Sequence, residues 1–146
     1  MTTYHGTVVD IGGAGILLRG PPGLGKSSLA LRLIDAEGFG LGQNPLRARL
    51  VADDQYLLEK TKAGLVARAP AALAGLLEIR GIGIVRMAYE AQAVLKLVVD
   101  LESGAALPRM PEAHEIQTDL MGVALKRLQL DASDPAAAAK IRASLF

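Results

Sequence analysis

The sequence predicts a compact mixed α/β domain. The chain has 146 residues, of which 51% are hydrophobic, and this is enough apolar material for one well-packed core. Short aliphatic runs separated by glycine clusters indicate strands and turns, whereas residues 26–37 carry apolar side chains at helical spacing. We therefore expect residues 1–146 to form a single domain built on a β-sheet.

The N-terminal third predicts a hairpin, a helix and a loop. Residues 7–11 and 16–19 are β-branched or aliphatic, and the glycines between them suit a tight hairpin turn. Residues 26–37 predict the clearest helix, because Gly38 follows as a helix stop. The glycine-rich stretch after this helix predicts a flexible surface loop that extends to about residue 49.

The remainder of the chain predicts strands followed by a second helix. Asp134 and Pro135 predict the N-cap and the first residue of a terminal helix that continues over residues 136–145. Apolar or alternating runs predict strands at residues 50–52, 55–59, 64–68, 76–79, 94–101, 116–120 and 123–128.

The composition excludes several classes of protein. The chain has 16 basic and 15 acidic residues, so its net charge of +1 argues against binding to nucleic acid or an anionic membrane through bulk charge. The absence of cysteine excludes disulfides and thiolate zinc sites, and it suits a cytoplasmic protein. The sequence shows neither a signal peptide nor an apolar run long enough to span a bilayer, so we expect a cytoplasmic location.

A phosphate-binding loop is the most specific motif. Residues 20–27 match the pattern G-x-x-x-x-G-K-[ST], between an expected strand and an expected helix. In this pattern Lys26 reaches the β- and γ-phosphates and Ser27 ligates Mg²⁺. The motif predicts a nucleoside triphosphate with Mg²⁺, and it does not specify what receives the phosphate. The expected nucleotide contacts are Gly20, Gly23, Leu24, Gly25, Lys26, Ser27 and Ser28.

Two acidic segments follow the motif. Asp53 and Asp54 come directly after an expected strand, where α/β sheets place their ligands, so they are candidates for a metal ligand and a catalytic base. Glu78 and Arg80 lie in an apolar run that continues as Gly81-Ile82-Gly83. On the residues alone, the pattern of this second segment favours a Glu/Arg ion pair at the edge of a sheet over a functional role.

These segments together resemble the catalytic domain of the HPr kinase/phosphorylase family. The resemblance rests on His5-Gly6, the phosphate loop, Val51-Ala52-Asp53-Asp54-Gln55, and Leu77-Glu78-Ile79-Arg80-Gly81-Ile82-Gly83-Ile84, which occur in this order. It implies a P-loop kinase fold of the HPr kinase and phosphoenolpyruvate carboxykinase-like type, in a short form without the N-terminal domain. It further implies a bacterial homohexamer that uses ATP and Mg²⁺ to phosphorylate a serine of the phosphocarrier protein HPr, within the control of carbon metabolism.

The resemblance also implies residue roles. Asp54 matches the base that accepts the seryl proton, while Ser27 and Glu78 match the Mg²⁺ ligands and Asp53 supports the metal or a water. Family members can reverse the reaction by phosphorolysis. The catalytic residues carried over by motif are His5, Lys26, Asp54, Arg80 and Arg109.

Four features depart from the family pattern. Besides the missing N-terminal domain, Ser28 stands where the family commonly has an acidic residue, and the loop at about residues 38–49 is longer than usual. The segment at about 129–146 lacks the family's Pro-x-x-x-Gly-Arg-Asn-like basic loop, which leaves phosphorolysis and the acceptor open. Two alternatives therefore stand beside an HPr kinase: a P-loop kinase of another acceptor, and a nucleotide-sensing regulator that transfers no phosphate. A GTPase is disfavoured because no Asn-Lys-x-Asp motif occurs in the chain.

Overall fold

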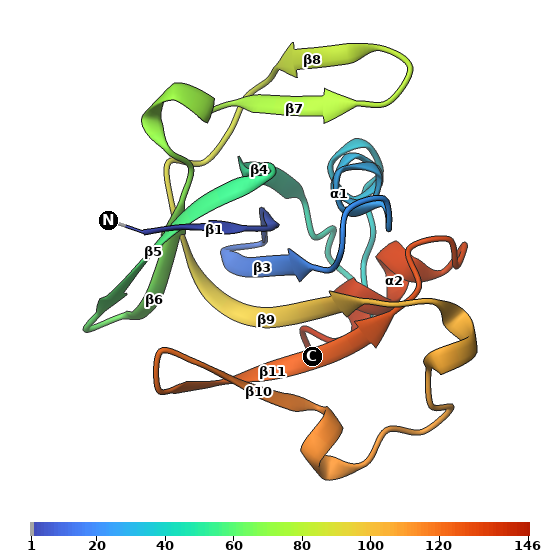
Figure 1. The fold of residues 1–146 in the computed structure, drawn as a ribbon. Helices are drawn as coiled ribbons and strands as arrows, with labels where there is room; N and C mark the ends of the chain where they lie inside the picture. Colours follow the sequence, from blue (N-terminus) through green and yellow to red (C-terminus); the bar gives the residue numbers. More distant parts are fainter. Residues whose placement is uncertain (1) are drawn as a thin grey trace.

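The fold is a curled β-sheet with two helices on one side and a separate hairpin at the edge (Figure 1). The computed structural model describes residues 2–146. The helices are α1 (Lys26–Asp35) and α2 (Ala137–Ala143), and three single-turn helices are η1 (Ala71–Leu73), η2 (Gly104–Ala106) and η3 (Ala113–Glu115). The nine strands of the main sheet are β1 (Thr3–His5), β2 (Thr7–Ile11), β3 (Ala14–Arg19), β4 (Ala48–Ala52), β5 (Gln55–Thr61), β6 (Gly64–Arg68), β9 (Ala93–Leu101), β10 (Gln117–Leu120) and β11 (Val123–Leu130). The separate hairpin consists of β7 (Leu76–Ile79) and β8 (Gly83–Arg86).

The curved strand β9 organises the main sheet. It pairs antiparallel with β6 near its start and parallel with both β3 and β11 along the rest of its length. The carboxyl ends of β3, β9 and β11 therefore meet at one edge of the sheet. Ligands of α/β sheets bind beyond such an edge, and the chain passes from β3 into α1 there.

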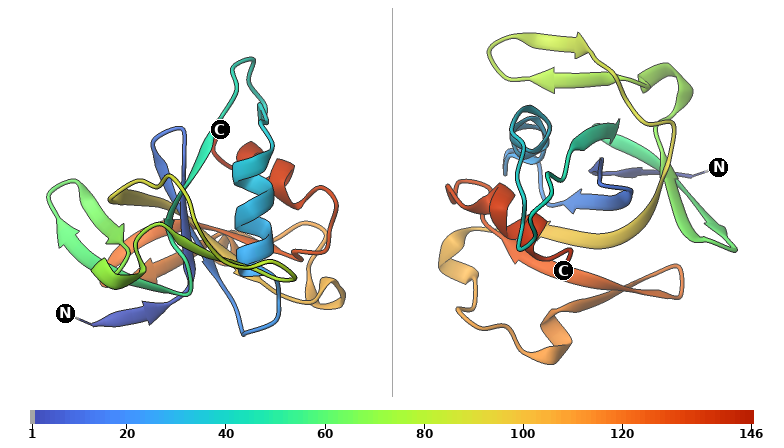
Figure 2. Two further views of the ribbon diagram at one scale, coloured as in Figure 1. Left: turned by 90° about the horizontal axis from the view of Figure 1, so that it is seen from above. Right: turned by 180° about the vertical axis from the view of Figure 1, so that it is seen from behind.

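The central strands are buried on both faces, which explains their nearly continuous apolar sequences. Side chains of β2 alternate, so that Val9 packs in the core beneath the helices while Val8 packs against the opposite core. The first core holds α1 and α2 through Leu29, Leu33 and Ile141. Figure 2 shows the two helices side by side on this face.

The structure confirms the mixed α/β fold class and corrects several boundaries. The helix predicted over residues 26–37 ends at Asp35, and the strand β8 was not predicted. The predicted loop at 38–49 ends earlier, because β4 already begins at Ala48. The terminal helix begins later than predicted, at Ala137, and its N-cap is Ala136. Asp134 instead stabilises the preceding turn, where its side chain accepts a 2.8 Å hydrogen bond from the Ala136 amide. Among residues 2–146, no helix is long and apolar enough to cross a membrane.

A buried arginine joins the two helices. Arg142 of α2 is only 3% exposed and donates hydrogen bonds of 2.8 Å to the carbonyls of Leu33 and Ala36, at the C-terminal end of α1. It also donates to the carbonyl of Leu46 at 3.0 Å, at the far end of the loop that follows α1. Burial lowers the pKa of Arg142. The cation satisfies carbonyls that α1 leaves without intrahelical partners.

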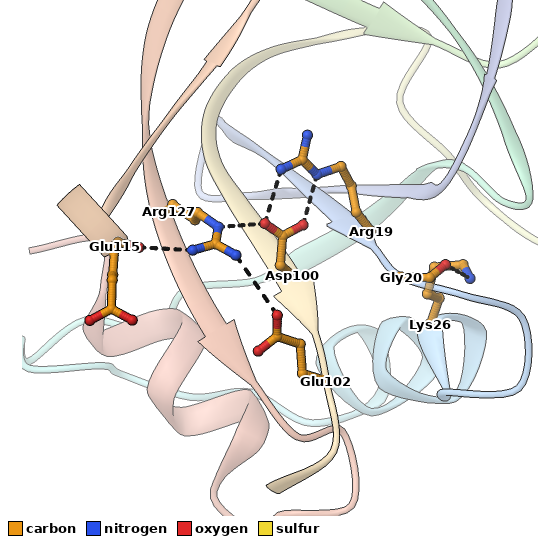
Figure 3. A network of polar contacts seen from close by, with 7 residues as sticks. All are labelled: Arg19, Gly20, Lys26, Asp100, Glu102, Glu115 and Arg127. Carbon is orange, nitrogen blue, oxygen red and sulfur yellow. Dashed lines mark hydrogen bonds and ion pairs between the residues drawn. The ribbon is translucent and has the colours of Figure 1, made fainter. Parts of the chain in front are cut away.

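A charged network crosses the three parallel strands (Figure 3). Asp100 of β9 accepts two hydrogen bonds from Arg19 of β3, at 2.8 and 2.9 Å, and one from Arg127 of β11 at 2.5 Å. Burial alone would raise the pKa of Asp100, but the two guanidinium groups outweigh it and hold the pKa below its usual value. The network fixes β3 against β9 directly before the phosphate loop begins at Gly20.

We expect Arg142→Met to lower the free energy of unfolding by about 3 kcal/mol, because it leaves buried carbonyls without a donor. Urea denaturation followed by circular dichroism measures the change. Arg109→Met, at an exposed position, is the matched control and is expected to have little effect. An Arg142→Met variant as stable as the control would contradict the structural role.

We expect Asp100→Asn to destabilise the chain at pH 7 by about 1–3 kcal/mol, since Arg19 loses its charged partner and Arg127 is left with the longer ion pair to Glu102, at 3.9 Å. A carboxylate with a lowered folded-state pKa contributes stability above its unfolded value, which is 3.8 here, and loses that contribution as the pH falls through the folded-state pKa. The difference from wild type should therefore shrink below about pH 4. Unfolding curves between pH 2 and pH 8 would measure it, and a difference that stays constant with pH would contradict the prediction.

Candidate active site

The phosphate loop has the backbone that its glycines permit. Gly20, Gly23 and Gly25 all have positive φ, at 154°, 85° and 89°. A Cβ at Gly20 would lie 3.1 Å from the carbonyl oxygen of Leu101, so a side chain there would also crowd the backbone of β9. Gly25 is the N-cap of α1, and the free amides at this helix end favour an anion.

Lys26 lies over the loop that precedes it. Its ammonium donates hydrogen bonds to the carbonyls of Gly20 at 2.7 Å and Pro21 at 3.2 Å, as Figure 3 shows for Gly20. The neighbouring Leu24 has a different environment, because its side chain packs against the core beneath the helices. Only the backbone amide of Leu24 can therefore bind a phosphate.

Asp53 is the polar centre of the site. It is 7% exposed and directly follows the last residue of β4, Ala52. One carboxylate oxygen, Oδ1, accepts hydrogen bonds from Ser27 Oγ at 2.7 Å and Thr7 Oγ1 at 2.9 Å. The other oxygen, Oδ2, accepts from the amide of Glu78 at 3.1 Å. One side chain thus joins β2, α1 and the β7–β8 hairpin.

Asp54 occupies a strained turn beside it. Its φ is 68°, and the Gln55 amide donates to the carbonyl of Asp53 at 2.8 Å, so Asp54 is the apex of a tight γ-turn. The Gly6 amide donates to the carbonyl of Asp54 at 3.0 Å and holds this conformation. A left-handed residue other than glycine costs about 1–2 kcal/mol and is frequent at functional sites.

One cavity of about 820 Å³ brings most of the predicted residues together. Asp53 lies beneath its wall rather than in it, and Arg109 is exposed in the segment after η2, outside the residues that line the cavity. Six further residues line the cavity, of which only Thr7 lies outside the segments that the sequence singled out. The other five are Pro22, Ile79, Gly81, Ile82 and Gly83. The predicted residues that line the cavity are His5, Gly20, Gly23, Gly25, Lys26, Ser27, Ser28, Asp54, Glu78 and Arg80.

The β7–β8 hairpin forms one wall of the cavity and stands apart from the main sheet in Figure 1 and in the right view of Figure 2. The fully buried Leu77 and the bond from the Glu78 amide to Asp53 anchor it. Within the described part of the chain, no ion pair joins Glu78 to Arg80, and both side chains are exposed along the cavity. The structure therefore does not support a Glu/Arg pair at a sheet edge.

The donor set fits Mg²⁺ held together with nucleotide phosphates. The Ser27 hydroxyl and the Glu78 carboxylate line the cavity, and Asp53 accepts a hydrogen bond from Ser27. Hard oxygen ligands of this kind suit Mg²⁺, which proteins usually bind through one or two carboxylates plus substrate phosphates. Residues 2–146 contain no cluster of three or more acidic or histidine side chains that could hold a metal ion alone.

Comparison with known sequences agrees with this geometry. A family model described as HPr Serine kinase C-terminal domain matches residues 1–142. The HPr kinase/phosphorylase of Bordetella pertussis is 36% identical over 140 residues, covering 88% of this chain and 42% of that protein. The HPr kinase/phosphorylase of Clostridium perfringens strain SM101 is 32% identical over 139 residues, with the same coverage of 88% and 42%. The chain thus spans about two fifths of the length of these curated relatives.

Comparison with solved structures gives the same fold. The Hpr(Ser) kinase/phosphatase from Coxiella burnetii superposes with a TM-score of 0.79 at 23% identity, covering 99% of this chain and 94% of that one. At this identity the likeness shows a shared architecture. The family match over residues 1–142 shows that the chain belongs to the family of HPr serine kinase C-terminal domains.

Proposed function

We propose that this chain is a serine kinase that transfers the γ-phosphoryl group of ATP to a seryl hydroxyl of the phosphocarrier protein HPr. The observation that carries the proposal is that the phosphate loop, Lys26 and the exposed Asp54 carboxylate share one cavity. A phosphate-binding element and a candidate base in the same space are what phosphoryl transfer to a hydroxyl requires. The relatives' name, HPr kinase/phosphorylase, supports HPr as the acceptor.

The phosphate loop and Lys26 bind the triphosphate in this proposal. Phosphate oxygens replace the carbonyls of Gly20 and Pro21 as acceptors for the Lys26 ammonium. Ser27 and Glu78 hold Mg²⁺, while Asp53 orients the Ser27 hydroxyl from behind. Bound Mg²⁺ supplies positive charge to the phosphate oxygens during transfer.

Asp54 receives the proton of the acceptor. The seryl oxygen forms a bond to the γ-phosphorus as the bond from phosphorus to the β–γ bridging oxygen breaks, ADP leaves, and the seryl proton passes to the Asp54 carboxylate. His5 and Arg80 line the same cavity and place donors near the transferred group. In the phosphorolysis direction, which the relatives' name supports, Asp54 returns the proton to the serine.

Several wider properties stay predictions from the family resemblance. They are hexameric assembly, a cytoplasmic location and a role in the control of carbon metabolism. A catalytic role for Arg109 also stays a prediction, since this residue lies outside the cavity.

The decisive experiment incubates the chain with HPr, ATP and Mg²⁺ and analyses HPr by mass spectrometry. The expected product is HPr phosphorylated on one serine, and inorganic phosphate added afterwards tests for its removal. Unmodified HPr despite bound ATP would contradict HPr as the acceptor and favour a different acceptor or a regulator that transfers no phosphate.

We expect Asp54→Asn to lower kcat by about 10²–10⁴-fold and to leave ATP affinity nearly unchanged, because asparagine keeps the left-handed turn but accepts no proton. Steady-state transfer to HPr and a separate ATP titration measure the two effects. Asp35→Asn, exposed at the end of α1, is the matched control. An Asp54→Asn variant with the wild-type rate would exclude Asp54 as the base.

We expect Lys26→Met to weaken ATP binding by about 10–100-fold through the loss of charge-assisted hydrogen bonds to phosphate. Isothermal titration with ATP and Mg²⁺ measures it. Lys62→Met, in the exposed turn between β5 and β6, is the control that should bind like wild type. Equal ATP affinities of the Lys26 and Lys62 variants would refute phosphate binding by Lys26.

A further inference from the structure

Thr7 is an unusual residue for its position in the sheet. It begins β2, is 0% exposed, and is followed by Val8 and Val9 in a strand that is otherwise apolar along its buried positions. Valine has nearly the same shape as threonine and would satisfy the packing, yet this site has a hydroxyl. A buried hydroxyl is costly unless it is hydrogen-bonded, so its partner indicates its role.

That partner is the carboxylate of Asp53. The antiparallel register pairs Val8 with Ala52, which places Thr7 opposite Asp53. The Thr7 hydroxyl donates to Oδ1 of Asp53 at 2.9 Å, and the same oxygen accepts the Ser27 hydroxyl at 2.7 Å. An ionised carboxylate only accepts hydrogen bonds, so both hydroxyl protons point to Asp53.

This arrangement determines which atoms Ser27 offers to the cavity. Because the Ser27 proton is directed to Asp53, the lone pairs of its oxygen are free for a cation. Asp53 can continue to accept the hydrogen bond from Ser27 only if its carboxylate does not rotate. The Glu78 amide fixes Oδ2 and Thr7 fixes Oδ1, from two different segments of the chain.

We propose that Thr7 is a positioning residue for the metal site. It holds Asp53 in the orientation that directs the Ser27 oxygen toward Mg²⁺, and its hydroxyl, which is bonded to Asp53, acts through that carboxylate. This inference rests on the proposed function, since it assumes that the site binds ATP with Mg²⁺. Partners that orient a metal-binding group typically change metal affinity or activity by about 10–100-fold when they are removed.

The test measures binding of a fluorescent ATP analogue as a function of Mg²⁺ concentration, without HPr. Thr7→Val should raise the Mg²⁺ concentration at half-saturation by about tenfold and leave metal-free binding of the analogue unchanged. Thr7→Ser, which keeps the hydroxyl, should restore the wild-type value. Thr3→Val, at an exposed threonine of β1, is the control for the substitution itself.

The outcomes separate this inference from the proposed function. A wild-type chain whose binding does not depend on Mg²⁺ would contradict the proposed function. If wild type depends on Mg²⁺ and Thr7→Val has the same half-saturation, the role of Thr7 is overturned. Thr7→Ala also removes the hydroxyl, and it serves in place of Thr7→Val if circular dichroism shows that the valine variant is unfolded. An equal loss in metal-free binding would also overturn the proposal, because it would indicate a general structural defect.

Discussion

The site depends on the hydrogen bonds that the Asp53 carboxylate accepts. Its donors come from β2, from the first turn of α1 and from the β7–β8 hairpin, three segments that lie far apart in the sequence. A buried carboxylate is unfavourable without such partners, so folding must bring all three segments together to stabilise it. The carboxylate at the centre of the candidate site thereby also fixes the strands and helix around it.

The helix that carries Lys26 and Ser27 is held at both ends. At its N-terminus, the Ser27 hydroxyl is bonded to Asp53, and the loop before it follows a strand fixed by the pair of Arg19 and Asp100. At its C-terminus, Arg142 supplies the donors that the last carbonyls lack. Binding a polyanion requires fixed amides rather than flexible ones, because ordering them on binding would reduce affinity. The C-terminal helix therefore supports the site through Arg142, although this arginine contacts α1 at the end remote from the cavity.

Sequence reasoning predicted most strands, α1 and the phosphate loop because their signals are local. Glycines at residues 20, 23 and 25 and the apolar spacing of α1 are visible within about ten residues. The partners of Arg142 were not predictable in this way, since Leu33 lies 109 positions away and no pattern links them. Thr7 was missed because a threonine in a strand is unremarkable until the register places Asp53 opposite it. For Glu78 and Arg80, opposite charges two residues apart suggested a pair, but both residues line the cavity.

The central place of β9 has a consequence for how the chain folds during synthesis. The phosphate-loop strand β3 forms its parallel ladder with residues 95–100, so this ladder closes only after some eighty further residues have been made. Parallel pairings of such large sequence separation are slow, because loop closure precedes any gain from the contacts. Until β9 emerges from the ribosome, β3 has only its antiparallel partner β2, and Arg19 lacks its carboxylate. A nascent chain that already contains the whole nucleotide motif is therefore not yet able to hold it in the binding conformation.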